Sequence, residues 1–136
     1  NSSFNTRPLQ LQAYERLVLL MERISPENLV SRINQRGMDA RNMQLLLIQN
    51  IKAEFEYNLA QQIYVSTDAW EAVKNVKEQL INLINQITGQ LPEQASGTEL
   101  NKRLMELVLK NEDQFPTQYA LNILNNEAKK LLHGKG

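Results

Sequence analysis

AWEAVKNVKEQLINLINQI, residues 69–87, is the segment whose periodicity decides the fold class. Its apolar residues recur at alternating steps of four and three, which keeps one face of an α-helix turned toward a neighbouring helix. These seam residues are Ala69, Val73, Val76, Leu80, Leu83 and Ile87, with Trp70, Ile81 and Ile84 beside them. We expect a helix that begins after Ser66 as its N-cap. The seam faces either the core of the same chain or, as a coiled coil, a second copy.

Three- and four-residue spacing of apolar side chains extends over nearly the whole chain, and no segment sustains the alternation of a strand. Further helices are expected to open at Arg7-Pro8, at Ser25-Pro26, over residues 40–63, after Thr98 as N-cap and near Thr117. In the helix over 40–63, the residues expected to face inward are Leu47, Ile51, Phe55, Leu59 and Ile63. Short polar breaks separate these segments, so we predict an all-α fold, a single compact antiparallel bundle of five to six helices.

Length and composition set the class of protein. The 136 residues form one helical domain over 1–136, with residues 1–7 expected to be flexible. The 15 Lys and Arg residues balance the 15 Asp and Glu residues, which argues against a nucleic-acid partner. The chain contains no Cys, and its apolar runs are far shorter than the roughly 20 residues that span a bilayer. Its first residue is Asn1 rather than Met, so we expect an anchoring segment upstream.

The inventory of reactive side chains is too poor for an enzyme. His133 is the only histidine, and Lys130 stands three residues before it, so the chain lacks the Glu-x-x-His pairs of a di-iron bundle. We interpret His133 as a cation at a helix C-terminus. The carboxylates that could form an acid–base pair in the long helices are Glu54, Glu56, Glu71 and Glu78. Glu54 and Glu56 point to different faces, and Glu71 and Glu78 are each expected to form a solvated ion pair with a lysine within helical reach, Lys74 or Lys77. We therefore predict no catalytic residue, no metal site and no cofactor.

One stretch is richer in partner-binding side chains than the rest. With Phe55, Leu59 and Ile63 turned inward, the residues left near the rim are Tyr57, Asn58, Gln61 and Tyr64. Tyrosine and amide side chains are suited to protein interfaces. The alternative is that both tyrosines lie at the edge of the core with their hydroxyls satisfied locally. Trp70 is likewise either a cover for the end of the core or an anchor for a partner.

The chain also resembles an uncharacterised family of Bacteroidota proteins. The resemblance covers residues 8–90 and rests on the segments LQAYERL (11–17), ERISP (22–26), EFEYNLAQQIYVS (54–66), Ala69-Trp70 and Val73-Lys74-Asn75. Beyond residue 90 only the helical pattern and the Pro116-Thr117 turn are similar. Members of that family begin with one membrane-spanning segment and a basic stretch, and no activity is known for them. The resemblance therefore implies a helical domain anchored to the membrane upstream, on the cytoplasmic side.

Two hypotheses follow for the function. The first is a non-enzymatic, membrane-tethered helical interaction module that docks a protein partner or a second copy of itself, as a homodimer, on the cytoplasmic face of the inner membrane. Without the anchor it would be cytoplasmic. Contact with the membrane would be made only through the upstream segment. The second hypothesis is a small-molecule or lipid-binding bundle, or an enzyme that works without side-chain nucleophiles, because the first and third expected helices carry more apolar residues than a narrow stripe needs.

Overall fold

The computed structural model describes residues 5–33 and 35–134, and the regular secondary structure of this part of the chain is entirely helical, with no strand. Six α-helices and two short 3₁₀ segments follow one another along it. The elements are α1 (Arg7–Ile24), α2 (Pro26–Arg32), α3 (Ala40–Tyr57), η1 (Leu59–Tyr64), α4 (Thr67–Gln90), α5 (Gly97–Lys110), η2 (Glu112–Gln114) and α6 (Pro116–Leu132). The prediction of an all-α fold is confirmed.

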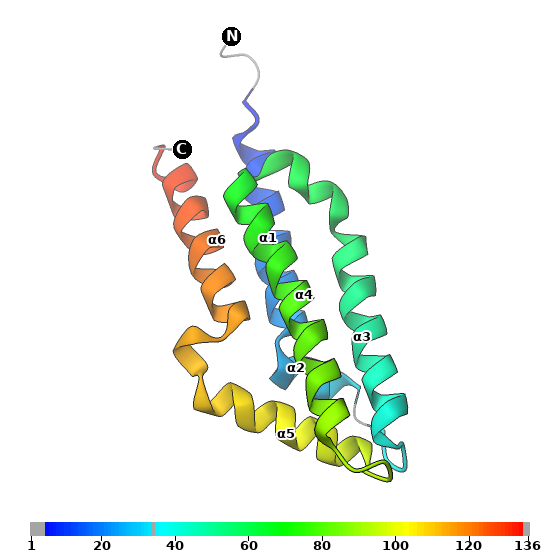
Figure 1. Cartoon of the computed structure of the whole chain (residues 1–136). Coiled ribbons are helices and arrows are strands. Elements are labelled where there is room, and N and C mark those ends of the chain that lie inside the picture. Colours follow the sequence, from blue (N-terminus) through cyan, green and yellow to red (C-terminus); the bar gives the residue numbers. More distant parts are fainter. Residues whose placement is uncertain (1–4, 34, 135–136) are drawn as a thin grey trace.

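Four of the helices form the body of the molecule. In Figure 1, α1 and α4 run downward, whereas α3 and α6 run upward. Helix α1 packs against α3 and α6, and α4 packs against the same two helices, so neighbours around the ring are antiparallel. This arrangement matches the predicted bundle.

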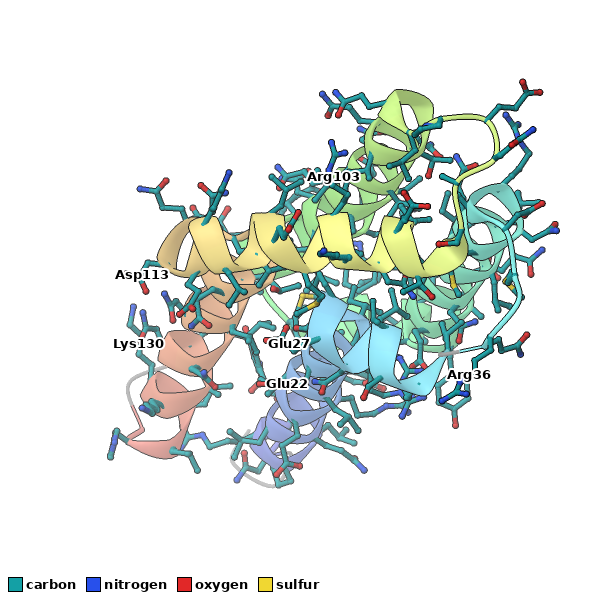
Figure 2. The ribbon with its side chains drawn as sticks, turned by 90° about the horizontal axis from the view of Figure 1, so that it is seen from below. Glu22, Glu27, Arg36, Arg103, Asp113 and Lys130 are labelled. Carbon is teal, nitrogen blue, oxygen red and sulfur yellow. The ribbon has the colours of Figure 1, made fainter. Side chains whose placement is uncertain are left out.

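The remaining helices depart from the prediction of one antiparallel bundle. Helix α5 crosses the lower end of the four-helix body, with the short helix α2 beside it (Figures 1 and 2). Two backbone hydrogen bonds fix this crossing: the Ala40 N–H donates to the Ala95 carbonyl (2.9 Å), and the Gly97 N–H donates to the Met38 carbonyl (2.8 Å). The starts of α3 and α5 are thereby held together. The polar linker before α5 therefore closes one end of the core instead of extending the bundle.

The seam of α4 lies inside the molecule. Ala69, Val73, Val76, Leu80 and Ile87 are all buried within the same chain. Ile84 is also fully buried, whereas the predicted seam residue Leu83 is only partly covered. Hence the interpretation of the seam as an intramolecular core is correct, and this face is not free for a coiled-coil partner.

Helix α3 is shorter than predicted, and the reason is the side chain of Asn58. Its Nδ2 donates to the Glu54 carbonyl (2.9 Å), the oxygen that the Asn58 N–H would reach in a continuous α-helix. The Asn58 N–H turns to the Phe55 carbonyl instead (3.0 Å), and the chain continues as the 3₁₀ segment η1. With three residues per turn, the steps of four no longer point inward. Leu59 and Ile63, predicted to be inward, are therefore 44% and 72% exposed.

The N-terminal caps agree with the sequence in part. Ser66 caps α4 as predicted, by accepting a hydrogen bond from the Ala69 N–H. Ser25 stands at the N-cap position of α2, but its hydroxyl donates back to the Met21 carbonyl (2.7 Å). The cap of α5 is Ser96 and not Thr98, because Ser96 and Glu99 form a reciprocal capping box.

Replacing the true cap of α5 tests this assignment. Ser96→Ala removes the acceptor for the Glu99 N–H, so we expect the free energy of unfolding to fall by about 1 kcal/mol. Thr98→Ala, at the cap position expected from sequence, is the matched control. This variant should change the free energy of unfolding by less than about 0.5 kcal/mol. Urea unfolding of the three proteins measures both effects. Equal losses in the two variants would contradict the capping box.

Both ends of the described chain can be compared with the prediction. Residues 1–7 are predicted to be flexible. Residues 1–4 of this stretch lie outside the described residues. At the start of α1, the Arg7 N–H donates to Asn5 Oδ1 (3.0 Å). His133 stands at the C-cap of α6, after Lys129 and Lys130 in its last turn.

In the described part of the chain, no helix is both long enough and apolar enough to cross a bilayer.

Candidate functional site

A groove of about 590 Å³ runs between α1 and α3. One face of each helix forms a wall of the groove. The lining residues of each face recur at i, i+3, i+4 and i+7, a spacing that places side chains one above another on a helix. Helix α1 contributes Arg16, Leu19, Leu20 and Arg23, α3 contributes Asn50, Ala53, Glu54 and Tyr57, and Asn58 follows the end of α3. The groove is open to solvent, because Leu19, Ala53 and Tyr57 in its lining are exposed.

Two large side chains in the groove are unusually exposed. Leu19 on α1 is 59% exposed, and Tyr57 on α3 is 78% exposed. Single exposed apolar residues are ordinary, but Leu19 and Tyr57 line the same hollow, from its two opposite walls. Tyrosine combines a large contact area with a polar tip and is enriched at protein interfaces. The groove therefore offers apolar contact from both of its sides.

Arg16 is held in a defined position at the Tyr57 end of the groove. Its guanidinium carbon lies 5.1 Å from the centre of the Tyr57 ring, a cation–π distance. Its Nε donates to Asn58 Oδ1 (3.2 Å). Asn58 is itself buried and anchored to the Glu54 carbonyl. Thus the amide that ends α3 also positions a cation on α1.

A cluster of two arginines and one glutamate lies at the groove: Arg23 and Glu54 line it, and Arg32 on α2 lies beside them. Arg23 donates to Glu54 Oε2 from Nε (2.8 Å) and from Nη2 (2.5 Å), and Arg32 Nη1 lies 3.9 Å from the same oxygen. Hydrogen bonding and attraction to Glu54 raise the pKa of Arg23. Burial and repulsion from Arg23 lower the pKa of Arg32, against an opposing effect of Glu54. Two guanidinium groups thus share one carboxylate.

The predicted partner-binding residues do not form one surface. Tyr57 and Asn58 lie at the groove, Asn58 as a buried positioning residue. Gln61 is half-buried in η1 and is not among the residues that line the groove, and Tyr64 lies at a different hollow. Trp70 is only 7% exposed, and its ring centre lies 5.2 Å from that of Phe55. Trp70 therefore covers the end of the core and has little surface left for a partner.

Sequence reasoning missed the α1 side of the groove. Leu19 belongs to the apolar run of residues 17–21, where Leu17, Leu20 and Met21 are buried and Leu19 is not. The position of Leu19 on the outer side of an otherwise buried run is the signal that could have identified it as a surface residue. Glu54, one of the carboxylates tested above for acid–base chemistry, is an ion-pair partner of Arg23. Glu71 does pair with a lysine, Lys74, at 3.5 Å on the surface.

A second hollow, of about 720 Å³, lies at the end of the body where α1 begins. Three hydrogen-bonding groups meet at it: Glu127 Oε1 accepts from the Tyr14 hydroxyl (2.5 Å) and from the Ser66 hydroxyl (2.6 Å), and the Tyr14 oxygen accepts from the Ser66 N–H (3.2 Å). Ile63 and Tyr64 lie beside them. The network joins α1, the cap of α4 and α6. Burial and the Glu127 carboxylate raise the pKa of Tyr14.

Tyr14→Phe tests the contribution of this network. The variant loses hydrogen bonds to a charged partner and to a backbone N–H, so we expect about 1–2 kcal/mol less stability at pH 7. Because the folded state raises the pKa of Tyr14, the stabilisation is present below the ordinary tyrosine pKa of about 10 and is lost as pH rises through the raised value. The difference between wild type and variant should therefore shrink above about pH 10.

Urea unfolding of wild type and Tyr14→Phe at neutral and alkaline pH measures this difference in stability. Tyr119→Phe removes a hydroxyl from a tyrosine that is 64% exposed and serves as the control at pH 7, with an expected change below about 0.5 kcal/mol. A difference between wild type and Tyr14→Phe that stayed constant, or grew, with rising pH would contradict the role assigned to Tyr14.

Comparison with known proteins places the chain in a family. The model of a family described as Family of unknown function (DUF7935) matches residues 1–131. The chain belongs to this family. The match to DUF7935 reaches well beyond residue 90, where the resemblance expected from sequence ended. No curated protein and no solved structure matches the chain. Within residues 5–33 and 35–134, no group of three or more His, Asp or Glu side chains is placed to hold a metal ion.

Proposed function

We propose that this chain is a non-enzymatic interaction module whose groove between α1 and α3 docks a helical segment of a protein partner. The single observation that carries the proposal is the exposure of Leu19 and Tyr57 on opposite walls of one groove. A partner helix lying between α1 and α3 would cover both side chains. An amphipathic helix in a groove is a recurring mode of recognition, with anchors at the spacing i, i+3 or i+4, and i+7.

The energetics of the proposed contact are concentrated in few residues. Interfaces commonly depend on aromatic and arginine anchors, and truncating one such anchor costs about 2 kcal/mol or more. Since each 1.4 kcal/mol corresponds to about tenfold in affinity, Tyr57→Ala should weaken partner binding by about tenfold to a hundredfold. Leu19→Ala should act in the same direction, with a smaller effect. Neither side chain is buried, so the fold should persist in both variants.

Site-specific photo-crosslinking in the native organism tests the proposal. A p-benzoylphenylalanine in place of Tyr57 should give a defined adduct with one protein, cross-linked through an amphipathic helical segment. Tyr119, on α6, is 64% exposed and is the matched control position, which should give no such adduct. Leu19→Ala should reduce the adduct formed from position 57. An adduct with a second copy of the chain would identify self-association instead. Equal adducts at the two positions would contradict the groove as the docking site.

The tether is a separate part of the proposal and rests on the family resemblance described above. A segment placed before α1 would attach at the upper end of the body in Figure 1, where α1 begins. We therefore propose a Bacteroidota protein held at the cytoplasmic face of the inner membrane. The full-length coding sequence would reveal the anchor. Residues 1–136 contain no Cys, so Glu78→Cys gives this domain a single thiol. In the full-length protein, with any cysteine outside these residues replaced by Ser, that thiol should resist membrane-impermeant reagents in intact spheroplasts.

The second hollow supports another candidate, a site for a small molecule or lipid. It combines the Tyr14, Ser66 and Glu127 network and Lys130 with the apolar residues Ile63, Val65 and Leu131. Pockets of a few hundred cubic ångströms with few polar groups are typical of ligand sites. Native mass spectrometry of protein purified without denaturation would detect a bound compound, and Ile63→Asp should release it. A spectrum free of ligand would remove this candidate.

A further inference from the structure

The guanidinium of Arg16 is preorganised to receive a carboxylate. Its Nε donates to Asn58 Oδ1, and its guanidinium carbon lies over the ring of Tyr57, 5.1 Å from the ring centre. Within residues 5–33 and 35–134, its two Nη atoms donate to no protein acceptor. They form the end-on fork that matches the two oxygens of a carboxylate in a bidentate pair. Since Asn58 and Tyr57 already restrict this side chain, little further rotamer entropy is lost when a partner binds.

The charge of the whole groove points in the same direction. Among the described residues that line it, Glu54 is the sole carboxylate, and its Oε2 already accepts two hydrogen bonds from Arg23. Arg32 lies beside the same oxygen. The lining therefore carries two guanidinium groups, Arg16 and Arg23, and one carboxylate, while Arg32 lies just outside the lining. A partner with negative charge would be attracted to this groove, whereas a positively charged one would be repelled.

We infer that the helical segment taken by the groove is acidic and places an Asp or Glu carboxylate on the two Nη atoms of Arg16, while apolar side chains of the same helix cover Leu19 and Tyr57. This inference rests on the proposed function and specifies the chemistry of the partner. Arg16 would then be a residue that determines specificity, and Asn58 a positioning residue behind it. The carboxylate pair selects among amphipathic helices that the apolar contacts alone would not distinguish.

Two synthetic peptides of equal length test the inference with the whole chain. Both carry the same leucine stripe at i, i+3, i+4 and i+7. One has Glu at every flanking position and the other has Lys, residues of similar helix propensity. Fluorescence anisotropy in low salt should show at least tenfold tighter binding of the Glu peptide. The preference should decrease in high salt, because exposed charges are screened.

Three variants assign the preference to Arg16. Arg16→Gln should weaken binding of the Glu peptide about tenfold and leave the Lys peptide unchanged or bound more tightly. Arg16→Lys keeps the charge without the fork, so it should restore only part of the affinity. Arg103→Gln, at an exposed position of α5 (Figure 2), is the control and should change the binding of neither peptide. Circular dichroism and urea unfolding establish that each variant is folded.

The possible outcomes separate the inference from the proposed function. Equal binding of the two peptides, or a preference for the Lys peptide, would overturn the inference and leave the groove as a helix-docking site. Loss of the Glu-peptide preference in Arg103→Gln as much as in Arg16→Gln would also overturn it. Binding of neither peptide, even at millimolar concentration, would remove the proposed function together with the inference. A preference that disappears in Arg16→Gln alone would support both.

Discussion

Leu17→Ala is expected to lower the free energy of unfolding by about 3 kcal/mol, because deletion of a fully buried leucine leaves a cavity as well as removing apolar contacts. Leu17 is completely buried in the middle of α1, where the helix packs against α3 and α6. With a denaturant dependence of about 1.5 kcal/mol per molar urea, the unfolding midpoint should fall by about 2 M. This is a large share of the total stability of about 5–15 kcal/mol typical of a domain.

Leu19→Ala is the matched control, two residues along the same helix. The side chain of Leu19 is 59% exposed, so its truncation should change the free energy of unfolding by less than about 0.5 kcal/mol. The same variant is expected to weaken partner binding, which separates the role of Leu19 from that of Leu17. If Leu17→Ala and Leu19→Ala destabilised the protein equally, the orientation of α1 described here would be wrong.

Gly97→Val is the second substitution with a large expected effect. A Cβ atom at position 97 would lie 3.0 Å from Met43 Cβ and 3.1 Å from the Met38 carbonyl oxygen. The same carbonyl accepts the Gly97 N–H, so the added side chain cannot be accommodated without separating the starts of α3 and α5. Overpacking of this kind costs about 1–3 kcal/mol, and the loss of the backbone pairing places Gly97→Val at the upper end of that range.

Urea unfolding measures this loss, and hydrogen exchange locates it. The Ala40 N–H, which donates to the Ala95 carbonyl, should exchange faster in Gly97→Val. Gly89→Ala provides the control, because a Cβ at position 89 would meet nothing within 4 Å. Gly89 lies near the end of α4, where alanine has the higher helix propensity, so the variant should be up to about 1 kcal/mol more stable. Unchanged stability in Gly97→Val would contradict the close approach of α5 to α3.

The local elements were predictable because their signals lie in neighbouring residues. The spacing of Val73, Val76 and Leu80 predicted α4, and Ser66 predicted its start. Even so, local patterns failed where two local interactions compete. Leu59 and Ile63 continue the steps of four in α3, but the Asn58 side chain takes the Glu54 carbonyl and ends the helix first. The predicted N-cap of α5 was also wrong, because Ser96 and Thr98 both precede the apolar residues of the helix and either could have capped it.

The candidate site was predictable only in part. Tyr57 was identified because a tyrosine beside an inward-facing Phe55 must lie toward the surface. Its partners in the groove, Leu19 and Arg16, stand about forty residues earlier on another helix, and no spacing in the sequence relates them to Tyr57. Gln61, Tyr64 and Trp70 were grouped with Tyr57 by sequence proximity, yet Trp70 is buried and Tyr64 lies at the second hollow.

By itself, the sequence determined that this protein is helical, where most helices begin, and which faces are buried, because periodicity and capping act over one or two turns. Only the tertiary structure decided that α5 crosses the end of the body, that α1 and α3 leave a groove between them, and that Arg16 is held at Asn58 and Tyr57. Those features depend on contacts between residues far apart in the chain. Such contacts arise from how whole helices pack, which no local pattern specifies.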